Sequence, residues 1–80
     1  MNVVHKITGY DRLTEALTYA FDLSGSDLDD LRQFTRVGPN DPSMLASYPL
    51  DRSSVAHIAH RLRLPMKLET CDWFIEPFAV

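Results

Sequence analysis

Alternation between apolar and polar side chains over residues 17–23 restricts the fold of this chain more than any other feature. Every second residue of the run is large and apolar: Leu17, Tyr19, Phe21 and Leu23. A period of two is typical of a strand with one face in the core and the other in solvent. The chain has 80 residues, which is room for one core around such a strand, so we expect a single domain over residues 1–80.

A second strand is predicted directly before this run. Residues 3–10 are rich in β-branched side chains, which favour extended backbone. The mostly polar residues 11–15 indicate a short hairpin loop between the two strands. Strands joined by such a short loop are most simply antiparallel neighbours.

The first of two predicted helices follows the hairpin. Ser26 is a good N-cap, and an apolar stripe at helical spacing begins at Leu28 and continues through Leu31 and Phe34. Gly38 and the proline after it predict the end of this helix, because a glycine followed by proline is a common stop signal.

The second helix is predicted to begin after Asp51, which can cap it, and to end near Arg63, because Pro65 follows. Between the helices, residues 38–50 contain three prolines and predict an irregular crossing loop. We expect four side chains to anchor this loop to the core: Met44, Leu45, Tyr48 and Leu50.

A third strand is predicted over residues 67–75, with Cys71, Trp73 and Ile75 on one face and Phe74 on the other. Pro77 is expected to close this strand or to place it at a sheet edge. The predicted fold is therefore an α+β, two-layer domain of order β-β-α-α-β, with a three-stranded antiparallel sheet and two helices on one face.

The predicted strands carry apolar residues on both faces, but two short helices can cover only one face. The uncovered apolar surface predicts a protein partner or self-association, for example as a homodimer, and the alternative is that the proline-rich loop or the tail residues Phe78 and Val80 cover it. Six residues are the candidates for partner binding: Asp27, Asp29, Asp30, Tyr48, Trp73 and Ile75. The aspartates can form an acidic edge for a basic partner, and the aromatic side chains are of the kind enriched in interfaces. A solvated acidic helix start and an ordinary aromatic core remain the alternatives.

Catalytic motifs are absent from the sequence, so we expect no enzymatic activity, no catalytic residue and no cofactor. Only three glycines occur, none in a phosphate-binding loop, and no serine lies in a G-x-S-x-G motif. The net charge of −3 does not favour binding to nucleic acid or to an anionic membrane. One cysteine, no long apolar run and no cleavage-like start together predict a cytoplasmic protein.

A metal site is the main alternative to protein binding. His57 and His60 lie three residues apart on the second predicted helix, so they share one side of it. They are weak metal ligand candidates, together with His5 or Cys71, because the spacing is not that of a known helical zinc motif. We therefore predict no metal, and Cys71 is expected to be a buried apolar side chain.

Several short segments resemble those of a set of short bacterial proteins to which no reaction is assigned. They are Gly9-Tyr10-Asp11-Arg12, Tyr19-Ala20-Phe21-Asp22-Leu23, Asp27-Leu28-Asp29-Asp30-Leu31, Asp41-Pro42 and Tyr48-Pro49-Leu50. The likeness covers roughly residues 4–52. It implies an immunity-like or accessory protein that binds another protein, by analogy between small acidic α+β proteins. A ligand-binding domain and a homo-oligomeric structural module remain the alternative functions.

Overall fold

The computed structural model describes residues 3–35, 41 and 43–80 of the chain. The α+β class predicted from the sequence is confirmed, because strands and helices both contribute to one core. Along the chain the elements are β1 (Val3–Asp11), β2 (Leu17–Asp22), α1 (Gly25–Leu31), the 3-10 turn η1 (Arg32–Phe34), β3 (Tyr48–Pro49), α2 (Arg52–Leu62) and β4 (Cys71–Ala79).

The sheet has four antiparallel strands in the order β2-β1-β4-β3, so the prediction of three strands was wrong. The additional strand is β3, in which Tyr48 pairs with Ile75 and Pro49 pairs with Phe74. The pairing continues one residue further, where the Leu50 amide donates to the Trp73 carbonyl over 2.9 Å. A strand of two residues contains no alternation, so only its non-local pairing with β4 reveals it.

The last strand runs over Cys71–Ala79 rather than over residues 67–75. Pro77 lies inside it, opposite His5 of β1. Backbone groups alternate in direction along a strand. The Trp73 carbonyl faces β3, so the backbone nitrogen of Pro77 is on the same side of the strand, away from β1. At the position of Pro77, β3 no longer pairs with β4. Proline therefore removes no bond from the β1–β4 ladder, as expected for a sheet edge.

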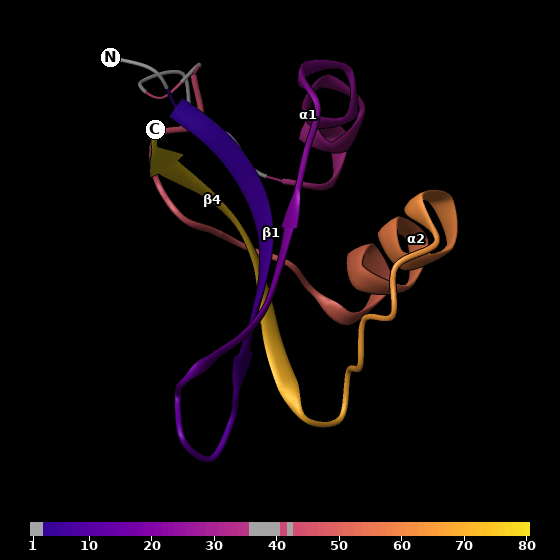
Figure 1. The fold of residues 1–80 in the computed structure, drawn as a ribbon. Coiled ribbons are helices and arrows are strands. Elements are labelled where there is room, and N and C mark those ends of the chain that lie inside the picture. The colour runs from indigo at the N-terminus through magenta and orange to yellow at the C-terminus, as the bar shows by residue number, and fades with distance from the viewer. Residues whose placement is uncertain (1–2, 36–40, 42) are drawn as a thin grey trace.

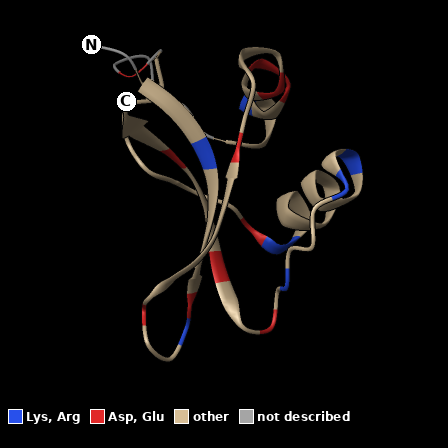
Figure 2. Cartoon of the chain, viewed as in Figure 1, with Lys and Arg blue, Asp and Glu red and all other residues tan. Residues whose placement is uncertain are grey.

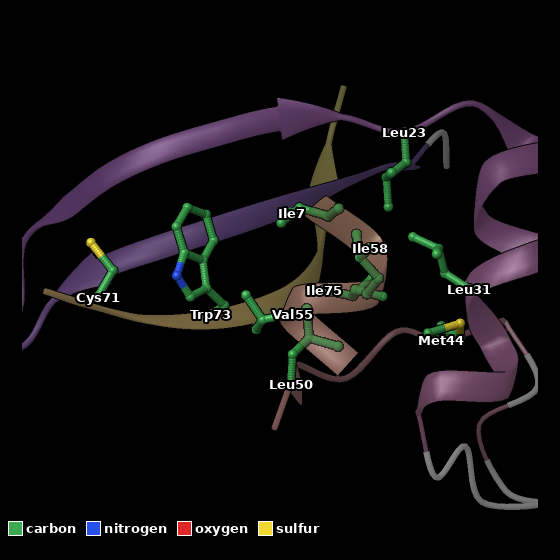
Figure 3. Close-up of a cluster of buried hydrophobic side chains, with 10 residues drawn as sticks. All are labelled: Ile7, Leu23, Leu31, Met44, Leu50, Val55, Ile58, Cys71, Trp73 and Ile75. Atoms are coloured by element: carbon green, nitrogen blue, oxygen red, sulfur yellow. The ribbon is translucent and has the colours of Figure 1, made fainter. Parts of the chain in front are cut away.

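Both helices lie on the same side of the sheet, and the other side carries no helix among the described residues (Figure 1). The core fills the space between these layers. Val55 and Ile58 of α2 and Leu31 of α1 are directed towards the sheet (Figure 3). Ile7 and Ile75 of the sheet belong to the same core cluster, and both are fully buried. Side chains at odd positions of β1 and β4 therefore form the covered face.

The ends of α2 are those predicted from the sequence, whereas the start of α1 differs from the prediction. The Asp51 carboxylate accepts the Ser54 N–H and caps α2, and Arg63 ends it, as predicted. The prediction of Ser26 as the cap of α1 was wrong, because the Ser24 hydroxyl accepts the Asp27 N–H. The helix stop predicted at Gly38 and the next residue lies outside the described residues.

The crossing segment is anchored by three of the four predicted side chains. Met44 is fully buried, Leu50 is buried, and Tyr48 packs against the core. Leu45 is 56% exposed, so its prediction as an anchor was wrong. The Asp41 carboxylate accepts the N–H groups of Leu45 and the next residue and so fixes the backbone at this exposed position. None of the helices within the described residues has the length and apolar character required to cross a membrane.

Candidate partner-binding face

The sheet has a second face that no helix covers among the described residues, and we call it the open face (Figure 1). It is formed by side chains at even positions of the two central strands, because odd positions point into the core. Tyr10 and Phe74 contribute half-buried rings that meet edge to face, with centroids 5.6 Å apart. Its members on β1 and β4 are Val4, Lys6, Thr8, Tyr10, Asp72, Phe74, Glu76 and Phe78.

A hollow of about 340 Å³ lies on the open face next to the β1–β2 hairpin. The rings of Tyr10 and Phe74 form part of its wall. Figure 2 marks the positions of charged residues along β4 and the hairpin. Four carboxylates and one guanidinium line the hollow, which is an excess of three negative charges: Asp11, Glu15, Asp72, Glu76 and Arg12.

Glu76 is the centre of a hydrogen-bond network in the hollow. Its Oε1 accepts the hydroxyl groups of Thr8 over 2.5 Å and of Tyr10 over 2.6 Å, and its Oε2 accepts that of Ser47 over 3.1 Å. Burial raises the pKa of the Glu76 carboxyl, but the three hydroxyl donors outweigh it and the net pKa is lowered. The hydrogen bond from the Tyr10 hydroxyl to Glu76, together with burial, raises the pKa of Tyr10. The carboxylate is thus held charged and fixed in orientation.

The hairpin brings further charges to the rim of the hollow. The Asp11 carboxylate accepts the N–H groups of Leu13 and Thr14 over 2.8 and 3.0 Å, and these bonds lower the pKa of Asp11. Arg12 reaches across to Asp72 of β4, with 3.1 Å between Nε and Oδ1. Glu15 has a left-handed backbone, with φ of 61°, and closes the loop at an exposed position.

Tyr48, a predicted partner-binding residue, is half-buried in β3 and its hydroxyl donates to the Asp41 carboxylate. This bond lowers the pKa of Asp41, helped by the N–H groups of Leu45 and Ala46. It also raises the pKa of Tyr48. The tyrosine therefore fixes the crossing segment to the sheet edge, and its neighbour Ser47 rather than Tyr48 itself lines the hollow.

The three predicted aspartates lie together on α1, away from the open face. Asp27 is half-buried in the first turn, and the other two are exposed. Asp29 pairs with Arg32 at 3.4 Å, and Asp30 pairs with Arg61 of α2 at 2.9 Å. Two of the three carboxylates therefore already have cationic partners within the chain.

Trp73 and Ile75 are core residues, with exposures of 2% and 0%. Both lie under the helices, so neither side chain is available to a partner in this fold. The Trp73 indole N–H donates to the Lys67 carbonyl over 2.9 Å, and its ring stacks with Tyr19 and Phe21 of β2. Trp73 and Ile75 therefore lie on the covered face of β4, whereas Phe74 lies on the open face.

The metal ligand candidates are not brought together. His57 and His60 are exposed on α2, and the ring of His57 packs against Phe34 with centroids 5.1 Å apart. Cys71 is buried at the start of β4. No group of three histidine, cysteine or acidic side chains suited to a metal ion occurs within residues 3–35, 41 and 43–80.

The sequence gives no sign that Glu76 belongs to the site, whereas the aromatic residues Tyr10 and Phe74 are recognisable from the sequence as a possible anchor for a partner. Glu76 lies beyond the predicted end of the last strand, so its register with β1 was not considered. The alternation of side chains along β4 does predict that Phe74 lies on the other face of the strand from Trp73. The convergence of three hydroxyl groups on one carboxylate joins positions up to 68 residues apart and has no local pattern.

The fold and the open face define the chain as a small two-layer α+β domain with an acidic hollow on the open face of its sheet. The chain belongs to a family described as a domain of unknown function (DUF7683), which matches residues 4–76. The match includes α2 and most of β4, so it extends beyond the segments on which the resemblance in the sequence rested. Comparison with curated proteins and with solved structures found no significant match.

Proposed function

We propose that this chain is a non-enzymatic protein-interaction module of the bacterial cytoplasm, acting as an immunity-like or accessory partner of another protein. The open face is the binding surface, and the partner presents a basic segment to it. One observation carries the proposal: the open face holds a hollow with two aromatic rings and an excess of negative charge. Exposed aromatic surface within a charged rim is typical of protein interfaces.

The chemistry of the hollow favours an arginine or lysine side chain of the partner. Carboxylates attract the cation, and the rings of Tyr10 and Phe74 can receive its apolar stem or its charged face. The three hydroxyl donors hold Glu76 in place, so little side-chain freedom is lost there on binding. Within the chain, Lys6 already lies 5.3 Å from the ring centroid of Phe78 on the same face.

The open face supports this role better than the acidic start of α1. Aspartates 29 and 30 are paired with arginines of the chain itself, as described above. The hollow has one arginine for four carboxylates and is also next to apolar rings. Electrostatic attraction speeds encounter and selects partners, while the desolvated aromatic contacts contribute most of the affinity.

A basic probe peptide tests the proposal without knowledge of the natural partner. The probe alternates arginine with glycine, and a peptide that alternates glutamate with glycine is its control. Amide chemical shifts are followed by NMR during titration at low salt. We expect the basic peptide to shift amides of Tyr10, Phe74 and the hairpin, and the acidic peptide to shift none of them.

Two charge reversals make the test specific for the hollow. Glu15→Arg places a cation at the rim, and Glu69→Arg makes the same change at an exposed position that does not line the hollow. Each variant changes the net charge from −3 to −1, because one negative charge becomes positive. We expect E15R to weaken binding by roughly threefold to tenfold, and E69R to weaken it much less. Equal effects, or shifts confined to α1, would contradict the proposal.

A further inference from the structure

The two edges of the sheet differ in how well they are protected from pairing with another strand. At one edge, β3 has two residues, and one of them is Pro49. At the other edge, β2 has six residues, none of which is lysine or proline, and its one charge is at the end, on Asp22. Natural edge strands are usually short or carry proline or inward charges that prevent pairing. By these criteria β3 is protected and β2 is open.

The backbone of β2 has groups directed away from the sheet. The Leu23 amide donates to the His5 carbonyl of β1 over 2.9 Å. Backbone groups alternate along a strand, so Phe21 also faces β1, whereas Ala20 and Asp22 face outwards. Ala20 and Asp22 are exposed. Their N–H and C=O groups form the hydrogen-bonding edge that a further strand would extend.

The sequence of this edge is nearly palindromic about Ala20. Reading outwards from Ala20, the chain has Tyr19 and Phe21, then Thr18 and Asp22, then Leu17 and Leu23. An antiparallel copy centred at Ala20 would oppose aromatic to aromatic, hydroxyl to carboxylate and leucine to leucine. Residues directly opposite in an antiparallel pair lie on the same face, so Tyr19 of one copy contacts Phe21 of the other on both sides of the axis. The bulge opposite Gly9 and Tyr10 falls at Thr18, so the regular self-pairing is that of residues 19–21, and Leu17 lies beyond the bulge on the face of Tyr10.

The side chains next to this edge are incompletely covered. Tyr19 and Phe21 stack on Trp73 with ring centroids 5.5 and 6.4 Å apart, yet both remain only half-buried. Leu17 is 50% exposed. A second β2 strand would place further aromatic and aliphatic side chains along this flank and continue the ring layer across the new boundary.

We infer that two copies of this chain dimerise through β2, in antiparallel register about a two-fold axis at Ala20, to form one continuous eight-stranded sheet. The occupant of the edge is a second copy rather than another protein because the strand is complementary to itself in one register. A two-fold axis requires such self-complementarity. The dimer leaves both open faces uncovered, on the same side of the sheet, so this inference does not depend on the proposed partner.

Sedimentation equilibrium over a dilution series tests the dimer, with three variants that isolate the axis. Ala20→Lys places two ammonium groups opposite each other across the axis, and Ala20→Glu places two carboxylates there. Lysine at an edge strand is compatible with the monomer fold. Ala56→Lys on α2 is the control, because Ala56 is also exposed but lies on the helix. Circular dichroism establishes that each variant is folded.

We expect a reversible dimer of the parent chain, at least a tenfold weaker dimer for A20K and for A20E, and an unchanged dimer for A56K. An equimolar mixture of A20K and A20E should dimerise again, because opposite charges then meet at the axis. A parent chain that remains monomeric at about 1 mM, which corresponds to a binding free energy weaker than about −4 kcal/mol, overturns the inference. A dimer that A20K leaves intact also overturns it, because the interface would then lie elsewhere.

Discussion

Gly9 shows how one residue without a side chain permits the aromatic core. It pairs with Trp73 of β4 and is buried beneath the indole ring. A Cβ atom at this position would lie 2.8 Å from Cη2 and Cζ3 of Trp73, which is closer than carbon atoms can approach. Trp73 is 2% exposed and stacks with two rings of β2, so its ring has no free space into which to move.

Gly9→Ala is therefore expected to destabilise the fold by about 1–3 kcal/mol, the usual cost of an overpacked core. Gly25→Ala is the matched control, because no atom lies within 4 Å of the added Cβ at the start of α1. It should leave stability unchanged or raise it by about 0.4–1 kcal/mol through the unfolded chain. Urea unfolding of both variants measures the difference. Equal midpoints would contradict the close contact between Gly9 and Trp73.

At the scale of elements, α2 ends on a backbone conformation that its residue does not favour. Arg63 has φ of 54° and ψ of 47°, the left-handed region, and its N–H donates to the Ala59 carbonyl. A side chain in this region costs about 1–2 kcal/mol relative to the right-handed helix, a cost that glycine does not have. Arg63 is exposed, so no packing of its side chain compensates for this cost.

Arg63→Gly should therefore stabilise the fold by about 0.5–1 kcal/mol, measured as a higher midpoint of thermal or urea unfolding. Arg63→Ala separates backbone strain from charge, because it removes the guanidinium but keeps a Cβ. We expect no stabilisation from R63A. A gain of equal size in both variants would show that charge, rather than backbone conformation, limits the stability at this helix end.

The elements differ in how far the sequence predicts them. β1, β2 and α2 carry strong local signals, namely alternation, helical periodicity and the Asp51 cap, and the structure contains each of them close to its predicted bounds. β3 is defined by pairing with residues of β4 that lie 25 and 27 positions further along the chain, which no local pattern encodes. β4 begins and ends four residues later than predicted, because Pro77 does not close the strand and is accommodated on its unpaired side.

The candidate site likewise has one part that local sequence patterns predict and one part that only the fold brings together. Alternation within β4 separates Trp73 from Phe74, so the sequence alone predicts that aromatic residues occupy both faces. It does not predict which face the helices cover, since this depends on the handedness of packing around the whole sheet. The charge of the hollow arises from Asp11, Glu15, Asp72 and Glu76, which a hairpin and a sheet register bring together. Asp27, Asp29 and Asp30 form a denser acidic run in the sequence, but two of them are paired with arginines of the chain.

At the scale of the whole molecule, charged hydrogen-bond acceptors link the open face to the hairpin and the crossing segment. The carboxyl groups of Glu76, Asp41 and Asp11 all have lowered pKa values in the folded chain. Tyr10 and Tyr48, which donate to two of them, have raised pKa values. Each of these groups therefore makes stability depend on pH.

The sign of the dependence is fixed by the direction of each shift. A carboxyl with a lowered pKa stabilises the fold above its unfolded pKa, about 4 for Asp and Glu, and loses this contribution as pH falls through the folded pKa. A tyrosine with a raised pKa contributes below its unfolded pKa of about 10, and this contribution is lost as pH rises through the folded value. We therefore expect a stability plateau between about pH 5 and pH 10, with losses on both sides.

Glu76→Gln isolates the contribution of the open face to the acid side of this plateau. The variant keeps an acceptor for the hydroxyl groups but has no charge to titrate, so stability should fall at neutral pH and change less between about pH 5 and pH 3. Ser47→Ala removes one of the three donors and should give a smaller effect in the same direction. Urea unfolding at a series of pH values measures both. If E76Q unfolds with the same pH dependence as the parent chain, the charge of Glu76 is not coupled to folding, and the rigid carboxylate proposed for the hollow is not present.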